Sequence, residues 1–182
     1  VYDWSGFGIG LGGWGTGVRA MDGIYIENNT VYDCGDSTPT SRFGAGILQD
    51  HAPATNVFFR NNIVKDCAFE QIVVKSGASA TVDHNLIDAF KNKTDAVKGT
   101  NVIEKNPLLE DVANGVFTLR GGSPAIDAGI NLYTQDFAGT SSPQGTMSDM
   151  GAYELVKGVG PHSPSRSLKM AIPVPDKSFR IE

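Results

Sequence analysis

The stretch IYIENNTVYDC, from Ile24 to Cys34, returns further along the chain as VFFRNNIVKDC, from Val57 to Cys67. Both copies place an Asn-Asn pair, a following aliphatic residue and a final Asp-Cys at the same positions. A third and more divergent copy, ATVDHNLIDAF, runs from Ala80 to Phe90. Repetition of a short unit is the sequence signature of a solenoid, in which each unit buries its apolar face against the next. The sequence therefore predicts stacked coils.

Within each copy, apolar and polar residues alternate, as they do in a strand that has one face in a core. The predicted inward residues form three layers: Ile24, Ile26 and Val31; Val57, Phe59 and Val64; and Ala80, Val82 and Ile87. An outward column, whose charges alternate in sign, holds Glu27, Arg60 and Asp83. Each copy is followed by a second predicted strand, at Ala45–His51, Glu70–Ser76 and Thr94–Thr100.

Two kinds of residue recur at fixed phases of the repeat. Asn tolerates left-handed backbone geometry at a sharp bend and bonds to nearby backbone, so we expect Asn29, Asn62 and Asn85 to stack at one corner as an amide ladder. Cys34 and Cys67 also share a phase, and a coil spacing of about 4.8 Å brings them within disulfide range. A disulfide and a pair of free thiols both fit this spacing.

The composition limits the classes of protein and partner. The chain has 182 residues, of which 40% are hydrophobic, enough for one core, and its short runs of β-branched and aromatic residues favour an all-β fold. The net charge of −5 gives no electrostatic support for a nucleic-acid partner, and no apolar run approaches the length of a membrane span. Two cysteines are too few for a disulfide scaffold or a zinc site.

The string I-x-x-N-N-x-V resembles the repeat of pectate-lyase-like proteins, which implies an all-β, right-handed parallel β-helix over residues 1–106. The motifs NPLL, GSPAIDAG and DMGAYE, which lie between Asn106 and Glu154, resemble the C-terminal segment of secreted bacterial β-helix proteins. That resemblance implies a secreted or cell-surface location. It also implies that residues 107–154 form a cap over the last coil, since a solenoid must cover its exposed end.

Three aspartates of this segment, Asp127, Asp136 and Asp149, either are part of the cap or form a carboxylate cluster that holds a structural cation. Residues 155–182 contain four prolines and little periodicity, which is typical of a linker or docking tail. At the other end, FGIGLGG (residues 7–13) already has the pattern of a strand inside a coil. We therefore expect further coils or domains of a parent chain upstream.

An outward column on the second strand of each coil is the predicted binding surface. The turn beside it carries the insertion GDSTPTSRFG (Gly35–Gly44), and insertions on one side of a solenoid are where binding sites are built. The column holds Asp50, Lys75 and Lys98. An acid and two amines on neighbouring coils suit an acidic sugar chain, although a surface ion ladder has the same pattern. Asp50, His51 and Trp14 are the predicted substrate contacts.

A local resemblance implies a reaction for the residues of this column. FEQIVVKS (Phe69–Ser76), followed one coil later by DAVKG (Asp95–Gly99), resembles the active-site coils of the chondroitinase B and alginate lyase family. The resemblance implies that Glu70 binds Ca²⁺, that Lys75 removes the proton alpha to the uronate carboxylate, and that Lys98 stands where the family has an assisting Arg. In such a site calcium neutralises the carboxylate and makes that proton more acidic.

The chain departs from that family at two positions. Ala68 occupies the place of a second glutamate, and Lys98 cannot reproduce the planar, bidentate contact of an Arg. With these departures, the sequence predicts a protein that binds or acts on an acidic polysaccharide, a polyuronate, with calcium-assisted β-elimination as the reaction if it is an enzyme.

Two other functions fit the same sequence. A glycoside hydrolase would use a pair of carboxylates from adjacent coils, drawn from Asp50, Glu70 and Asp95. A non-catalytic carbohydrate-binding or structural solenoid would use exposed aromatic rings as platforms for sugars, and its candidates are Trp14, Tyr25 and Phe58.

Overall fold

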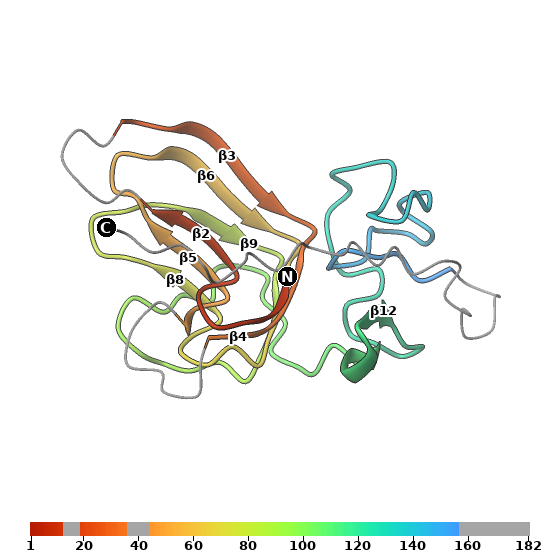
Figure 1. Ribbon diagram of the computed structural model, residues 1–182. Coiled ribbons are helices and arrows are strands. Elements are labelled where there is room, and N and C mark those ends of the chain that lie inside the picture. The colour runs from red at the N-terminus through yellow and green to blue at the C-terminus, as the bar shows by residue number, and fades with distance from the viewer. Residues whose placement is uncertain (13–18, 36–43, 157–182) are drawn as a thin grey trace, which may run out of the picture.

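The computed structural model describes residues 1–12, 19–35 and 44–156, and these residues form a parallel β-helix (Figure 1). The chain winds through three parallel sheets in turn, so that each coil adds one strand to each sheet. The predicted all-β, parallel β-helical class is therefore confirmed. No helix among the described residues is long and apolar enough to cross a membrane.

The three sheets have the following members. Sheet A contains β1 (Tyr2–Trp4), β4 (Thr30–Cys34), β7 (Ile63–Lys65) and β10 (Leu86–Asp88). Sheet B contains β2 (Ile9–Gly12), β5 (Ile47–Asp50) and β8 (Ile72–Val74). Sheet C contains β3 (Asp22–Glu27), β6 (Thr55–Arg60) and β9 (Thr81–Asp83).

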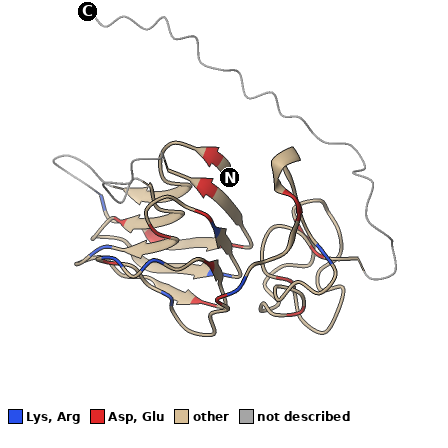
Figure 2. Ribbon diagram, turned by 90° about the horizontal axis from the view of Figure 1, so that it is seen from below, with Lys and Arg blue, Asp and Glu red and all other residues tan. Residues whose placement is uncertain are grey.

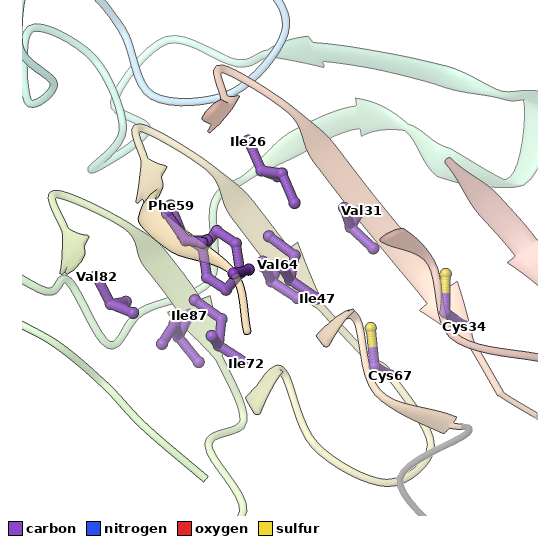
Figure 3. Packing of buried hydrophobic residues seen from close by; sticks show 12 residues of the cluster. Ile26, Val31, Cys34, Ile47, Phe59, Val64, Cys67, Ile72, Val82 and Ile87 are labelled. Carbon is purple, nitrogen blue, oxygen red and sulfur yellow. The ribbon is translucent and has the colours of Figure 1, made fainter. Parts of the chain in front are cut away.

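The inward side chains stack in register, as the alternation predicts. Ile26 lies opposite Phe59, and Val64 lies between Val31 and Ile87 in sheet A. Figure 3 shows that these side chains point into one interior, where most of them are almost completely buried. Each coil thus covers the apolar face of its neighbour, which stabilises the stack through the hydrophobic effect.

The amide ladder forms at the corner between sheets C and A. The Asn62 Nδ2 donates to Asn85 Oδ1 at 2.9 Å, and the Asn29 Nδ2 donates to Asn62 Oδ1 at 3.0 Å. The left-handed backbone belongs to the residue before each ladder member, with φ of +52° at Asn28 and +54° at Asn61. In each Asn-Asn pair, the first residue therefore makes the bend and the second builds the ladder.

Cys34 and Cys67 are free thiols, and both are fully buried. Figure 3 shows one above the other in adjacent coils. Their sulfurs occupy space left by glycines of the next sheet, since a Cβ at Gly46 would lie 2.8 Å from Cys67 Sγ and one at Gly8 would lie 2.9 Å from Cys34 Sγ. Of the two alternatives left open by the sequence, the structure has the thiol pair.

The predicted strand at Thr94–Thr100 does not form. The Ala96 N–H donates to the Lys93 carbonyl at 3.2 Å, and this turn reverses the chain so that Ala96 pairs with Val73 in the antiparallel direction. Val97, the residue after this bridge, then packs against the core. The periodic pattern cannot show such a reversal, because a turn sets it locally.

The C-terminal segment lies along the side of the β-helix rather than over its last coil (Figure 1). It begins with an antiparallel hairpin formed by β11 (Leu109–Asp111), the 3-10 helix η2 (Val112–Asn114) and β12 (Val116–Leu119). Phe117 of β12 lies 4.8 Å from Tyr2 and 5.9 Å from Tyr32, measured between ring centroids. The segment therefore covers the outer face of sheet A.

The aspartates of this segment organise its loops. Asp127 Oδ1 accepts the Thr146 N–H at 2.9 Å, and Asp136 accepts backbone N–H groups at both of its oxygens. Asp149 does the same, with the N–H groups of Asp127 and Leu155 as donors. No group of three or more His, Cys, Asp or Glu placed to hold a metal ion occurs among residues 1–12, 19–35 and 44–156. The hydrogen bonds of these aspartates are therefore to backbone N–H groups within the segment.

Candidate functional site

Asp50 and Lys75 meet at the ends of β5 and β8, as the predicted column requires. Gly12 pairs with Asp50 in register, so the neighbouring coil has no side chain at this level. The Lys75 Nζ lies 2.8 Å from Asp50 Oδ1, and the exposed fractions of their side chains are 37% and 5%. A buried carboxylate thus fixes the position of an exposed ammonium group.

Lys98 is held by other groups. Its Nζ lies 2.8 Å from Glu104 Oε1 and 4.6 Å from the centroid of the Phe90 ring. Lys75 and Lys98 each have a carboxylate of their own, so neither needs a ligand to offset its charge. Figure 2 shows acidic and basic residues interspersed along the coils.

His51, another predicted substrate contact, cannot be used in the same way. His51 is 2% exposed, and its Nε2 lies 2.8 Å from the Arg19 carbonyl oxygen, while its backbone N–H donates to Gln49 Oε1. A side chain buried in this manner organises the turn after β5 and does not reach a polysaccharide in this structure. Trp14 lies outside the described residues.

Glu70, the predicted calcium ligand, is fully buried, and the backbone N–H of Lys93 faces its carboxyl group. Burial raises its pKa, and the opposing influences come from the Lys93 backbone and from the charges of Lys93 and Lys91. The Lys91 Nζ donates to the carbonyl oxygens of Cys67 and Ala68, at 2.6 and 2.9 Å. Two lysines of the following coil therefore border this carboxyl group.

These surroundings do not fit a calcium centre built from the described residues. Calcium binds about six to eight oxygen ligands, of which several are usually carboxylates. Glu70 supplies one carboxylate, Ala68 supplies no second one, and the neighbouring charges are cationic. The arrangement suits a carboxyl group that is neutralised by burial or by its lysine neighbours.

The carboxylates of the hydrolase alternative are separately engaged. Asp50 pairs with Lys75, and Asp95 Oδ1 accepts the Ser76 N–H at 3.2 Å. Glu70 is inaccessible to a substrate in this structure. A retaining hydrolase needs two carboxyl groups facing the same glycosidic bond, and this set does not provide them.

The outer face of sheet C carries an aromatic pair, of which Tyr25 is exposed and Phe58 is half-buried. The rings of Tyr25 and Phe58 are stacked, with centroids 5.2 Å apart and planes inclined by 8°, and Tyr25 is 57% exposed. The guanidinium carbon of Arg60 lies 4.8 Å from the Phe58 centroid and 5.9 Å from that of Tyr25. The two residues that the sequence offered as sugar platforms are thus adjacent.

A polar network that the sequence did not predict borders this pair. Glu27 and Arg60 form the expected ion pair across coils, with the Arg60 Nε donating to Glu27 Oε1 at 2.6 Å. The other carboxylate oxygen, Glu27 Oε2, accepts the Tyr133 hydroxyl at 2.7 Å. Tyr133 belongs to the C-terminal segment, 106 residues away in sequence, so only the fold could bring it here.

No protein-family profile matches the chain, and no curated protein sequence matches it significantly. The resemblances to β-helix families therefore rest on the motifs themselves and on the parallel coils that the structure contains.

Proposed function

We propose that this protein binds an acidic polysaccharide on the side of its β-helix where β5 and β8 end, with Lys75 as a principal contact. The supporting observation is the pair of Asp50 and Lys75, in which a nearly buried carboxylate positions a partly exposed ammonium group. An ammonium group has three N–H donors, and the bond to Asp50 uses one of them. The remaining donors suit the carboxylate of a uronic acid.

Binding is better supported than β-elimination. A lysine that acts as a general base must be the neutral amine, whereas the pair with Asp50 is formed by the ammonium group. Lys98, in the place of the assisting Arg, is engaged with Glu104. Elimination remains the second candidate because of the local resemblance to the chondroitinase B and alginate lyase family.

The experiment compares the protein with two charge-neutralising variants. Lys75→Gln keeps a donor for Asp50 but removes the positive charge, and Lys105→Gln removes an exposed charge beyond the last coil. We expect the affinity for polygalacturonate and alginate, measured by calorimetry at low salt, to fall about tenfold or more in Lys75→Gln and to be unchanged in Lys105→Gln. Equal affinities in all three proteins would contradict the proposal.

The same samples separate binding from cleavage. Unsaturated uronate products absorb in the ultraviolet, so the absorbance of each mixture is followed with and without calcium. We expect no increase for the wild-type protein. A calcium-dependent increase that is lost in Lys75→Gln would instead assign the protein to the lyases.

A further inference from the structure

We infer that the polysaccharide bound at Lys75 carries isolated uronate residues separated by uncharged sugars, and not an uninterrupted run of uronates. This inference rests on the proposed binding at Lys75 and specifies the ligand of that site. Its basis is that Lys75 lies between two aspartates. Asp50, in the coil before, is its ion-pair partner, and Asp95, in the coil after, lies at the same end of β8.

Hydrogen bonds fix the position of Asp95. Val74 donates its N–H to the Asp95 carbonyl at 3.0 Å, and Ser76 donates its N–H to Asp95 Oδ1 at 3.2 Å. Asp95 is half-buried, and its backbone is in the left-handed region, with φ of +69°. The carboxylate of Asp95 is therefore anchored beside the residue that follows Lys75.

Two lysines of the same coil lie toward the other end of β8. Val97 donates its N–H to the Ile72 carbonyl, so the next residue, Lys98, lies near the start of the strand. The Lys93 Nζ lies 4.5 Å from the centroid of the Phe69 ring, which precedes the strand. The end of β8 that forms the proposed site therefore has a carboxylate of this coil beside it, while these two cations lie elsewhere.

On the other side of Lys75, cations and aspartates alternate from coil to coil. Asp50 is one coil before Lys75, and the exposed Arg19 belongs to the coil before that, where its carbonyl oxygen lies 2.8 Å from His51 Nε2. Successive coils are about 4.8 Å apart, so Arg19 and Lys75 belong to coils about 10 Å apart. The cations are thus separated by the coil that carries Asp50.

This alternation selects the spacing of charge along the ligand. One residue of a 1→4-linked sugar chain is about as long as one coil spacing, so consecutive uronates crossing the coils place carboxylates beside Asp50 and Asp95. Like charges at this distance repel. An isolated uronate binds Lys75 with uncharged sugars on both sides, and the hydroxyl groups of those sugars are hydrogen-bond donors that carboxylates accept.

The test uses hexagalacturonate and a partly methyl-esterified form of the same hexamer, in which the free carboxylates are fewer and further apart. We expect calorimetry at low salt to show that the wild-type protein binds the esterified form about threefold or more tightly. Because the repulsion is electrostatic, salt at about 1 M should remove most of this preference.

Asp95→Asn tests the source of the preference. An asparagine tolerates the left-handed backbone of this position and keeps an oxygen for the Ser76 N–H. We expect this variant to bind hexagalacturonate about threefold more tightly than the wild-type protein does, with unchanged affinity for the esterified form. Asp111→Asn is the matched control, because it removes the same charge at an exposed position of the C-terminal segment. Melting temperatures verify that the variants are folded.

The outcomes separate this inference from the proposed function. The inference is overturned if the wild-type protein binds hexagalacturonate as tightly as the esterified form or more tightly, or if Asp95→Asn and Asp111→Asn bind alike. In either case, binding that weakens in Lys75→Gln would still support the proposed function. Absence of binding of both hexamers to the wild-type protein would overturn the inference and the proposed function together.

Discussion

The side chain of Asn62 donates to Asn85 Oδ1 at 2.9 Å while its own oxygen accepts from Asn29 at 3.0 Å. The same Nδ2 also donates to the Ile26 carbonyl, and the Asn62 oxygen accepts the Asn29 backbone N–H. Asn62 is fully buried. One amide therefore satisfies side-chain groups of both neighbouring coils and backbone groups of the preceding one.

Replacing Asn62 by Ala leaves these buried groups without partners. We expect the free energy of unfolding, measured with urea, to fall by about 1–3 kcal/mol. Asn92→Ala is the control, since Asn92 is exposed and its backbone is not in the left-handed region. If both variants lose the same amount of unfolding free energy, the amide ladder does not stabilise this corner.

The buried carboxyl group of Glu70 makes stability depend on pH. Its folded-state pKa is raised above the 4.5 of an ordinary Glu, so the unfolded chain releases its proton first as the pH rises. The stability of the wild-type protein should therefore fall, relative to Glu70→Gln, as the pH rises above about 4.5. Denaturation at pH 4 and pH 7 measures this difference, and Glu104→Gln, at an exposed glutamate, is the control.

The effect of calcium on the melting temperature tests the role of Glu70 independently. We expect calcium to leave the melting temperature of the wild-type protein unchanged, because the charges that act on Glu70 from the described part of the chain are those of lysines. A calcium-dependent rise in the wild-type protein that is absent in Glu70→Gln would establish Glu70 as a ligand after all.

Asp149 should add a second pH dependence with the same sign. Burial, together with the charges of Glu154 and Asp127, raises its pKa from 3.8 to about 6. The stability from the protonated group is present below about pH 4 and is lost as the pH rises through about 6, by about 3 kcal/mol. The unfolding free energy of the wild-type protein minus that of Asp149→Asn should therefore decrease between pH 4 and pH 6. Asp111→Asn, at an exposed site, is the control and should show no such trend.

The C-terminal segment should stabilise the coils by covering sheet A. Ile63 and Leu86 are fully buried and pack with Leu109, Leu119, Ala125 and Met150. We expect Met150→Ala to lower the free energy of unfolding by about 2–4 kcal/mol, and Leu108→Ala, at an exposed position, to have little effect. A chain that ends at Asn106 should aggregate, and its remaining soluble with an unchanged melting temperature would contradict this packing.

Sequence reasoning succeeded where the signal is local and periodic. The inward position of Ile26, Phe59 and Val82 follows from alternation, which depends only on residues two apart. The phase of Asn62 follows from the repeat. Because coils stack in register, a correct phase in one copy fixes the neighbours in the next.

The parts that were not foreseen depend on contacts without a period. The position of Val97 is set by a reversing turn, and the bond from Tyr133 to Glu27 joins two separate parts of the chain. The burial of His51 and Glu70 depends on which loops cover them. From residue type alone, both were predicted to lie at an accessible site, since charged and polar side chains are usually exposed.

The reversal at Ala96 has a consequence for the length of the solenoid. The carbonyl of Ile72 accepts from Val97, and the N–H of Val74 donates to the Asp95 carbonyl, so the groups that β8 would offer to a following parallel strand are already used. An open sheet edge is a template for adding strands, either from the same chain or from another molecule. By pairing Ala96 with Val73 in the antiparallel direction, the protein closes the β8 edge of sheet B to both kinds of growth.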